Sequence, residues 1–308
     1  MHKSINNIPP IAVLMATYNG APYLQEQLDS IISQSLQPSI IIVSDDGSTD
    51  ATQSILETYA NNGKITFIKN ASTHGVVGNF LNCLNQLPKG YYFALADQDD
   101  IWHQNKLEKC FEAIQKIEIE NLPCMVYTDL RLIDERKNII NNSFRNELGH
   151  NKYKHCLETL LFGNFVLGCT TLSNYKMKEY LLKVPVINNF NHDAWMALVS
   201  FSIGKSFSID DPLVNYRQHA NNVTLSNHIK KTRLERYLTH IKFLFSKNNF
   251  LNDRFIIIEL FLEEFNNLIP NDNLLKFKQF IRLKNKSYLF KKISFEISFF
   301  THWTKRFS

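Results

Sequence analysis

The sequence predicts an α/β fold in which helices cover both faces of a mostly parallel sheet, followed by a helical region at the C-terminal end. Two observations support this prediction. Over the first 130 residues, short continuous apolar runs alternate with segments of helical spacing, a pattern typical of parallel strands buried on both faces. From residue 229 onward the spacing is helical, with a break at Pro270.

Five apolar runs in the first half are predicted strands, and polar residues directly follow the first, second and fourth of them. The strands are expected at residues 11–16, 40–43, 65–68, 91–96 and 124–129. Helical spacing follows the first two strands, and a further helix is expected from about Gln104 to Glu120. Ligands of parallel sheets bind at the carboxyl ends of the strands, so the three polar clusters are expected to meet at one edge.

The second half is less regular. Residues 163–173 predict a loop and then a strand, and residues 213–219 predict a short strand. Between them a helix is expected to begin near Asp193, because a carboxylate suits a helix N-terminus. The same helix is expected to end at Gly204, as a C-terminal glycine.

Charge divides the chain into two parts. Residues 230–308 contain sixteen Lys+Arg and seven Asp+Glu, a balance of +9, whereas residues 1–229 contain eighteen and twenty-two, a balance of −4. We therefore expect an α/β domain over residues 1–228, with halves at about 10–130 and 131–228, and a basic, aromatic-rich helical region over 229–308.

Composition excludes several classes of protein. A hydrophobic content of 44% over 308 residues is enough for a large core, and no run approaches the roughly 18 apolar residues of a membrane-spanning helix. The first ten residues lack the apolar stretch of a secretory signal. The five cysteines are odd in number and have no disulfide or metal spacing, so free thiols in a reducing cytoplasm are expected.

The stretch "ALADQDDIW" places Asp97, Asp99 and Asp100 at the end of the fourth strand. Carboxylates this close repel one another, and a divalent cation would neutralise them. Mg²⁺ and Mn²⁺ prefer oxygen ligands and commonly bind one or two carboxylates together with substrate phosphates. Asp-x-Asp therefore predicts a metal–diphosphate site. The alternative is a cap for the following helix, which is the role expected of Asp100.

The chain resembles the family 2 glycosyltransferases, which have the GT-A fold. The similarity lies in "ATYNG", "YLQEQLDSI", "IIVSDDGSTDAT" and "LADQDDIW", and it continues in "GNFVLGCTTL", "NHDAWMALV" and "YRQHANNV", in the manner of a bacterial branch described as rhamnosyltransferases. It covers roughly residues 10–225. The resemblance implies an enzyme whose first half binds a nucleotide sugar and whose second half binds the acceptor.

The resemblance implies a donor site in the first half. Asp45 matches the aspartate that reads the nucleobase. A carboxylate accepts hydrogen bonds and cannot donate them, so it suits the N3–H of uracil or thymine. A UDP- or dTDP-sugar is therefore expected. The alternative is that Asp45 and Asp46 only form the turn and cap the next helix. The other residues expected at the nucleotide are Thr17, Tyr18, Asn19, Asp46, Asn79 and Asp97. For Tyr18 the alternative is packing, and for Asn79 a structural role at a helix N-terminus.

The resemblance also implies the reacting groups. Asp99 is expected to bind Mn²⁺ or Mg²⁺, with Asp97 facing the ribose or a metal-bound water. Asp193 matches the general base of an inverting transfer, in which a carboxylate takes the proton of the acceptor hydroxyl. His192 departs from the family, which more often has Glu before this aspartate.

Four further residues carry expected roles with open alternatives. Arg217 is expected to bind the diphosphate, since arginine suits a bidentate contact, and His219 to supply a further metal ligand or to lie at the surface. Trp102 and Trp195 are expected either to contact the acceptor or to belong to the core.

The C-terminal residues 274–308 hold nine Lys+Arg, one Glu and nine aromatic residues. Amphipathic helices of this composition lie at membrane surfaces, where an enzyme could extend a lipid-linked saccharide. The alternatives are a helical subdomain with its aromatic residues inside, or an oligomer contact. No nucleic-acid partner is expected, because no recognisable module accompanies the charge.

The sequence as a whole predicts an inverting, metal-dependent glycosyltransferase, cytoplasmic or peripheral on the inner face of the plasma membrane. The expected reaction transfers rhamnose from dTDP-rhamnose, or a hexose from a UDP-sugar, to a hydroxyl of a growing lipid-linked surface polysaccharide. The alternatives are a nucleotidyltransferase, disfavoured because no glycine- and arginine-rich loop follows the first strand, and an inactive sugar-nucleotide-binding or scaffold protein.

Overall fold

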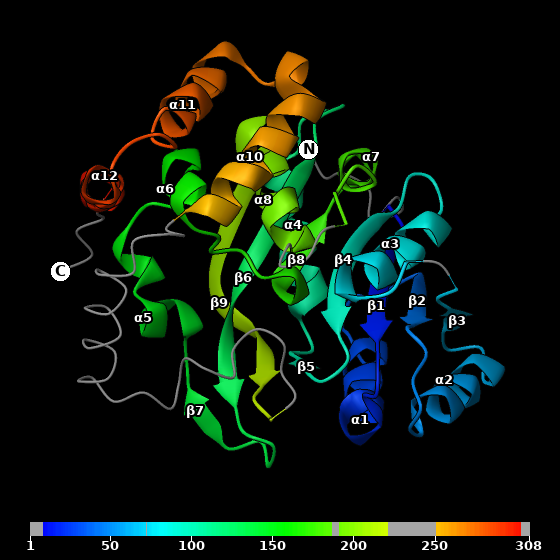
Figure 1. The fold of residues 1–308 in the computed structure, drawn as a ribbon. Helices are drawn as coiled ribbons and strands as arrows, with labels where there is room; N and C mark the ends of the chain where they lie inside the picture. The colour runs from blue at the N-terminus through cyan, green and yellow to red at the C-terminus, as the bar shows by residue number, and fades with distance from the viewer. Residues whose placement is uncertain (1–8, 72, 187–190, 221–250, 303–308) are drawn as a thin grey trace, which may run out of the picture. The chain divides into compact units, whose positions relative to one another are not determined.

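The first half of the chain builds four parallel strands by the predicted alternation of strand and helix (Figure 1). A computed structural model describes residues 9–71, 73–186, 191–220 and 251–302. The strands pair in the order β3-β2-β1-β4, with bounds β1 (Ile11–Thr17), β2 (Ile40–Asp45), β3 (Thr66–Lys69) and β4 (Tyr92–Asp97). The connecting helices are α1 (Ala21–Ile32), α2 (Thr52–Asn61) and α3 (Val76–Gln86). The predicted strands at this end of the chain are confirmed.

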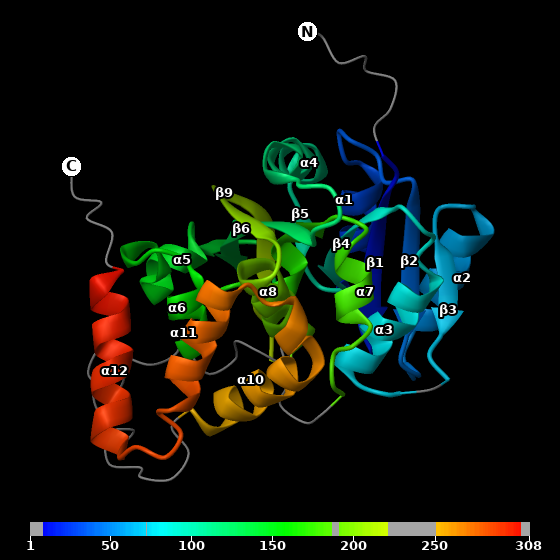
Figure 2. The ribbon, with the colours of Figure 1, turned by 90° about the horizontal axis from the view of Figure 1, so that it is seen from above.

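Helices cover both faces of these strands. The chain moves from β1 to β2 to β3 in one direction and then returns past β1 to β4. Right-handed crossovers therefore put α1 and α2 on one face and α3 on the other. Figure 2 shows α1 and α4 (Lys106–Ile117) on one side of the strands and α3 with α7 (Met177–Leu181) on the other. Both faces of β1 and β4 are consequently buried.

Beyond β4 the sheet becomes mixed. The short strand β8 (Thr171–Ser173) pairs antiparallel with both β4 and β6 (Cys124–Ile133). It follows a loop and a single 3₁₀ turn, η2 (Gly168–Thr170), rather than a crossover helix, and so it runs against its neighbours. The remaining strands are β5 (Ile101–Trp102), β7 (Ile139–Asn141) and β9 (Lys205–Arg217). The parallel prediction therefore applies to the first four strands, and β9 begins well before the strand predicted at 213–219.

The remaining helices lie mainly in the second half of the chain. They are α5 (Phe144–Leu148), η1 (His150–Lys152), α6 (Leu157–Phe162), α8 (His192–Ser202), α10 (Asn252–Phe265), η3 (Asn266–Leu268), α11 (Asn271–Ile281) and α12 (Tyr288–Thr301). The predicted break at Pro270 is confirmed, because this residue is the N-cap of α11. The predicted domain boundary at residue 228 lies outside the described residues.

The chain folds into two compact units. The first comprises residues 1–131, 142–144 and 166–216, and the second comprises residues 132–141, 145–165 and 217–308. Aliphatic residues of the strands form the core of the first unit. The second unit has an aromatic core, in which the Phe280 ring lies 5.0 Å from the rings of both Phe162 and Phe255. Each unit also buries side chains of the other kind, such as Phe93 in the first and Leu160 in the second.

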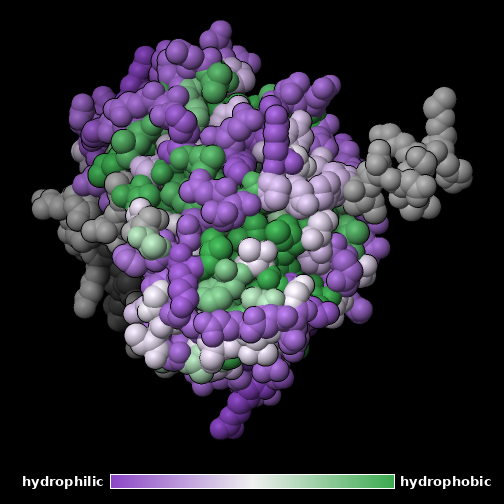
Figure 3. All heavy atoms as spheres, turned by 90° about the vertical axis from the view of Figure 1, so that its right-hand side faces the viewer, coloured by the Kyte–Doolittle hydropathy of each residue, from purple (hydrophilic) through white to green (hydrophobic). Residues whose placement is uncertain are grey.

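The surface is not uniformly hydrophilic. On the face shown in Figure 3, apolar residues gather in patches between hydrophilic ones. In the first unit the large apolar side chains that are exposed include Tyr18, between β1 and α1, and Val76, at the start of α3. Scattered exposed apolar residues of this kind are usual in folded proteins.

The helix predicted to end at Gly204 does end there, since Ile203 is the C-cap of α8, but the glycine has a further role that the sequence does not predict. It is absent from the residues with positive φ, so it does not end α8 in the left-handed conformation. A Cβ at Gly204 would instead lie 1.7 Å from the carbonyl oxygen of Pro123. The glycine is required because two backbone segments approach each other closely.

We expect Gly204→Ala to lower the free energy of unfolding by roughly 2 kcal/mol, since overpacking against a backbone atom forces the chain apart. Urea unfolding measures the change. Gly163→Ala is the matched control, because a Cβ at Gly163 meets no atom within 4 Å. Equal stability of the two variants would contradict this explanation.

Candidate active site

The end of β2 is organised by one buried carboxylate. Asp45 has no exposed surface, and its two oxygens accept four hydrogen bonds. Oδ1 accepts from Thr17 Oγ1 at 3.0 Å and Ser48 Oγ at 2.5 Å, and Oδ2 accepts from the backbone N–H groups of Gly47 at 3.2 Å and Ser48 at 2.9 Å. These four hydrogen bonds are those expected of the turn-forming alternative for Asp45, and its role at a nucleobase stays a prediction.

The loops after β1 and β2 are joined by short hydrogen bonds. The N–H of Asn19 donates to Ser48 Oγ at 2.8 Å, and Asn19 Oδ1 accepts from the N–H of Thr49 at 2.8 Å. Asn19 has a φ of 48°, a conformation that asparagine tolerates better than most residues. The next N–H, of Gly20, donates to Thr52 Oγ1 at 2.8 Å. The segments "TYNG" and "DDGSTDAT" therefore form one rigid surface.

Asp46 is the carboxylate of this pair that lies nearer the solvent, with a side chain 12% exposed. Its Oδ1 accepts from Asn70 Nδ2 and faces His74 Nδ1, both at 2.8 Å, and its Oδ2 accepts from the N–H of Gly75 at 2.8 Å. Asp46 thus lies beside the loops that precede α3. Of the two aspartates, it is the one placed to contact a ligand at this edge.

Thr17 and Asn79 lie beneath this surface. Thr17 is 1% exposed and Asn79 2% exposed, and Asn79 Nδ2 donates to the carbonyl oxygen of Thr17 at 3.1 Å. Asn79 lies in the first turn of α3, and these contacts are those expected of the structural role given as its alternative. Tyr18, by contrast, is 56% exposed and its side chain is free to contact a ligand at the sheet edge.

Gln98, between the two aspartates of Asp-x-Asp, connects the loops after β1 and β4. Its side-chain amide accepts from the N–H of Tyr18 and donates to the carbonyl oxygen of the same residue, both at 2.9 Å. A Cβ at Gly20 would lie 2.1 Å from Gln98 Oε1, so a larger residue there would displace the Gln98 amide from Tyr18. The sequence predicts no role for Gln98, because a glutamine between two aspartates does not indicate which residue it will hydrogen-bond.

Three carboxylates interact at the end of β4. Burial, followed by the charges of Asp99 and Asp193, raises the pKa of Asp97 to about 7, against a hydrogen bond from the Cys169 thiol that lowers it. Asp193 lies in the first turn of α8 and accepts from the N–H of Ala194 at 2.6 Å. These three residues therefore lie in one electrostatic cluster. They are the predicted metal ligand (Asp99), the predicted ribose or water contact (Asp97) and the predicted general base (Asp193).

A buried lysine lies beside this cluster. Lys106, the first residue of α4, has no exposed surface, and its Nζ lies 3.3 Å from the centre of the Trp102 ring. Burial lowers the pKa of Lys106 to about 8, while the charges of Asp100 and Asp97 act in the opposite direction. The lysine partly balances the acidic cluster from below. The sequence does not predict this role, because a single lysine in an amphipathic helical pattern looks the same as a solvent-facing one.

Asp100 does not cap a helix, contrary to the prediction. It is followed by β5, and α4 begins six residues later with Asn105 as its N-cap. Asp100 is fully buried, and its ligand atoms, those of Asp97 and those of Cys169 lie within 4.8 Å of one another. Burial, together with the charges of Asp100 and Asp97, raises the pKa of the Cys169 thiol well above its usual value.

Neither tryptophan presents a face to an acceptor, and the core alternative is correct for both. Trp102 is 3% exposed and Trp195 1% exposed. Trp195 Nε1 donates to the carbonyl oxygen of Tyr180 at 3.0 Å, while the Trp102 ring supports Lys106. Each ring fills the interior with its large apolar area.

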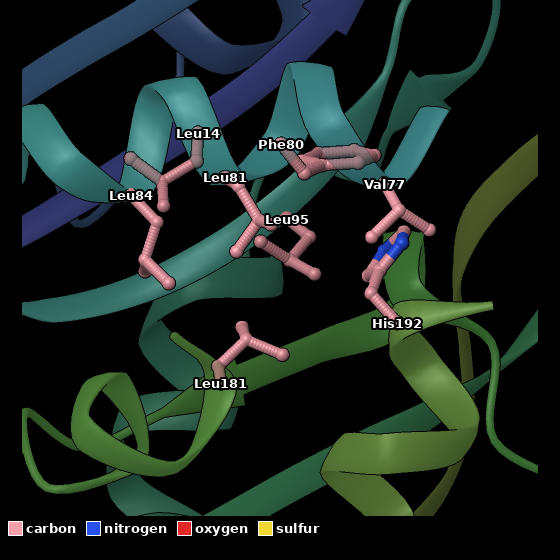
Figure 4. Close-up of a pocket in the computed structure, with 8 residues that line it drawn as sticks. All are labelled: Leu14, Val77, Phe80, Leu81, Leu84, Leu95, Leu181 and His192. Atoms are coloured by element: carbon pink, nitrogen blue, oxygen red, sulfur yellow. The ribbon is translucent and has the colours of Figure 1, made fainter. Parts of the chain in front are cut away.

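His192 occupies an apolar pocket instead of a polar one. Figure 4 shows its ring directed toward Val77 and Phe80 of α3, and the ring centres of His192 and Phe80 are 4.4 Å apart. The other lining residues are Leu14, Leu81, Leu84, Leu95 and Leu181. Neither ring nitrogen has a hydrogen-bond partner among the described residues, and burial lowers the pKa of His192 to about 4. The imidazole is therefore neutral.

Gly168 fixes the distance between this histidine and the loop before β8. A Cβ at Gly168 would lie 2.9 Å from His192 Nε2 and 3.7 Å from Asp193 Cβ. The motif "GNFVLGCTTL" therefore contributes a glycine that packs against the candidate base, and Cys169, which contacts the acidic cluster.

Arg217 and His219 belong to the second unit. Arg217 is 1% exposed and its NH1 donates to the carbonyl oxygen of Glu135 at 3.2 Å, and His219 is half-buried. Their predicted roles at the diphosphate and the metal remain predictions.

Residues 12–170 match the protein family described as Glycosyl transferase family 2. This match covers more than half of the chain. The chain belongs to glycosyl transferase family 2. The resemblance inferred from the motifs is thereby confirmed.

Relatives of this family 2 member include bacterial transferases of differing length. A dTDP-rhamnosyl transferase, RfbG of Shigella flexneri, is 30% identical over 72% of this chain and 77% of its own length. An uncharacterized glycosyltransferase of Rickettsia prowazekii is 28% identical over 70% of this chain and 66% of its own. The chondroitin synthase of Escherichia coli is 30% identical over 46% of this chain, which spans only 20% of that protein.

Solved structures support the fold. TarS of S. aureus, in complex with UDP-GlcNAc, superposes with a TM-score of 0.61 at 14% identity over 96% of this chain and 82% of its own. The mannosyltransferase PcManGT of Pyrobaculum calidifontis, in complex with GDP-Man and Mn²⁺, has a TM-score of 0.50 at 16% identity over 95% and 80%. The predicted GT-A fold is confirmed.

The acidic cluster of this family 2 member fits a hard divalent cation. Asp97 and Asp99 offer carboxylate oxygens at the end of β4, the donor type that Mg²⁺ and Mn²⁺ prefer. The mutual repulsion that raises the pKa of Asp97 is the kind of strain that a bound cation relieves.

Replacing the buried lysine is expected to be costly. Lys106→Met removes the positive charge beside the buried carboxylate of Asp100 and the half-buried carboxylate of Asp97, so we expect the free energy of unfolding to fall by about 3 kcal/mol at pH 7. Urea unfolding tests this. The control is Lys109→Met on the same helix, where the exposed pair with Asp211 at 2.5 Å should contribute less than about 1 kcal/mol. Similar small losses in both variants would refute the role of Lys106.

The neutral histidine predicts a pH-dependent stability. The pKa of His192 is about 4 in the fold and about 6.5 when unfolded. Below pH 6.5 the unfolded chain binds the proton first, so this residue lowers stability by up to about 3 kcal/mol as the pH falls to 4.

His192→Leu removes that contribution and leaves no buried ring nitrogen without a partner. As the pH falls from 7 to 5, the free energy of unfolding of the variant should therefore rise progressively relative to that of the natural protein, as measured by urea unfolding. Parallel stability profiles of the two proteins would show that His192 does not titrate in this way.

Proposed function

We propose that the protein is an inverting, metal-dependent glycosyltransferase that transfers a sugar from a nucleoside diphosphate to a hydroxyl of a growing saccharide. The observation that supports this most directly is the interaction of Asp97 with both Asp99 and Asp193 at the end of β4. Family 2 membership supports the same class of reaction. A direct displacement requires an acidic cluster that acts at the leaving group and a separate carboxylate that acts on the acceptor.

Nucleotide binding is assigned to the surface formed by the loops after β1 and β2. Asp46 replaces Asp45 as the base-reading carboxylate, because Asp45 is buried and fully engaged. Tyr18 and Asn19 flank the base, while Thr17, Asp45 and Asn79 hold the loops from beneath. A carboxylate accepts from N3–H, so the donor is a UDP- or dTDP-sugar. The named activity of RfbG favours dTDP-rhamnose.

The divalent cation would be held by Asp99, with Asp97 facing the ribose or a bound water. When bound, Mn²⁺ or Mg²⁺ acts as a Lewis acid that stabilises the negative charge developing on the nucleoside diphosphate as it leaves. Lys106 contributes a fixed positive charge under Asp97 and Asp100. Arg217 is proposed to contact the diphosphate, and His219 the metal.

Asp193 is the proposed base. Its position in the first turn of α8 favours the ionised carboxylate, since helix N-termini stabilise negative charge. The hydrogen bond from the N–H of Ala194 orients one oxygen. The carboxylate takes the proton of the acceptor hydroxyl while the hydroxyl oxygen attacks the anomeric carbon on the face opposite the leaving diphosphate, which inverts the configuration.

The acceptor is proposed to be a lipid-linked surface polysaccharide at the inner face of the plasma membrane. The chondroitin synthase relative, which is named for a saccharide product, favours a saccharide acceptor. The basic residues after 274 favour a membrane location.

Donor binding and turnover separate the proposed roles. We expect Asp193→Asn to bind dTDP or UDP with Mn²⁺ as tightly as the natural protein, within about twofold, yet to lose at least about 100-fold in transfer rate, as for removal of a general base. Asp99→Ala should instead lose the metal-dependent part of nucleotide binding. Calorimetric titration measures the first property, and release of labelled sugar to a saccharide acceptor measures the second.

Asp211→Asn, at an exposed surface pair, is the control for removal of a carboxylate and should change neither property. Full transfer activity in Asp193→Asn would refute the mechanism. Failure of the folded natural protein to bind UDP, dTDP, GDP or CDP, with or without Mn²⁺, would refute the transferase activity itself.

A further inference from the structure

Helix α12 exposes a continuous apolar face. Five of its large apolar side chains are between 47% and 78% exposed, namely Leu289, Phe290, Ile293, Ile297 and Phe300. At about 100° per residue these five positions fall within roughly 100° of the helix circumference. Only Glu296 and Thr301 share the exposed side with them. The face is therefore a stripe and not a set of scattered apolar residues.

The opposite side of α12 holds the helix on its own unit. The Phe299 ring lies 4.5 Å from Tyr153, and the Phe295 ring lies 5.8 Å from Phe162. Ser298 Oγ also donates to the carbonyl oxygen of Glu158 at 3.3 Å. These contacts position the helix without the apolar stripe, so the stripe is not needed to attach α12 to the unit.

Positive charge surrounds the stripe. Lys292 borders the stripe and is paired at 2.8 Å with Glu296, the single acidic residue from 274 onward, whereas Lys291 lies on the inner side, with its Nζ 5.2 Å from the centre of the Phe255 ring. Exposed basic residues also precede the helix at Arg282, Lys286 and Lys284, the last of which is paired with Glu259 at 2.7 Å. An apolar stripe bordered by basic residues complements a surface that has acyl chains beneath anionic head groups.

The helix is too short to cross a bilayer. Its fourteen residues span about 21 Å at 1.5 Å per residue, compared with a hydrocarbon thickness of roughly 30 Å. Among the described residues no helix is long and apolar enough to cross. The composition and length fit a helix that lies along a membrane surface.

We propose that the exposed stripe of α12 docks on the surface of a bilayer that contains anionic lipid. The docking deepens the proposed function, because it would bring the enzyme to a lipid-linked acceptor, but the contact itself depends on no nucleotide or sugar. The apolar side chains enter the region of the head groups, and the exposed basic residues Arg282 and Lys286 pair with lipid phosphates.

Vesicle flotation of the full chain, without donor or metal, tests the docking. We expect binding to vesicles of phosphatidylcholine with 30% phosphatidylglycerol, weaker binding to phosphatidylcholine alone, and weaker binding at high salt. The triple variant Leu289→Ser/Ile293→Ser/Ile297→Ser should bind the anionic vesicles at least about tenfold more weakly. Unchanged circular dichroism and nucleotide affinity would show that the variant is folded.

The matched control changes three similarly exposed apolar residues on other helices or loops of the same unit, Ile256→Ser/Leu268→Ser/Leu275→Ser, and should bind as the natural protein does. Absence of vesicle binding, or equal weakening in the two triple variants, would overturn the proposal. A concentration-dependent dimer that the α12 variant alone loses would also overturn it, since a second copy would then cover the stripe. Transfer to a soluble acceptor that persists in any of these cases leaves the proposed function intact.

Discussion

The buried carboxylate of Asp45 is the constraint on which the nucleotide side of the molecule depends. A charged group without exposure is tolerated only when hydrogen bonds replace its water, and here four donors do so. Two of the donors are backbone N–H groups of the loop after β2, and one is the hydroxyl of Thr17 at the end of β1. The same carboxylate therefore fixes two adjacent strand ends. Its neighbour Asp46 is presented at the surface as a result.

The acidic side of the site follows a different logic. Burial and the charges of Asp99 and Asp193 raise the pKa of Asp97, while the Cys169 thiol and the Lys106 ammonium act in the opposite direction. The balance at Asp97 is therefore unfavourable to its charged form. Such a site favours cations, since a bound cation removes the remaining repulsion.

The sequence predicts the strands, the polar clusters and the family because each depends on local patterns. Strands β1, β2 and β4 are continuous apolar runs, and the motifs follow them directly. It does not predict which of Asp45 and Asp46 is buried, because that depends on donors brought from β1. Nor does it predict Lys106 beside the aspartates, since a lysine in the first turn of α4 reads as a solvent-facing residue.

Other differences have the same origin in tertiary contacts. Gly204 lies at the predicted helix end, but the approach of Pro123, eighty-one positions earlier, explains the glycine. Each tryptophan could contact a sugar or belong to the core, and its burial decides for the core. The strand predicted within residues 163–173 is β8, but so short a run carries no signal of its antiparallel direction.

The amide of Gln98 has a consequence for the order of ligand binding. The Gln98 side chain hydrogen-bonds to both the N–H and the carbonyl oxygen of Tyr18. The loop after β4, which bears the aspartates, and the loop after β1 are therefore held in position together. A ligand that orders either loop prepares the other, at no further cost in conformational entropy. A cation and a nucleotide bound as proposed would therefore each raise the affinity of the other by the same factor, whichever binds first.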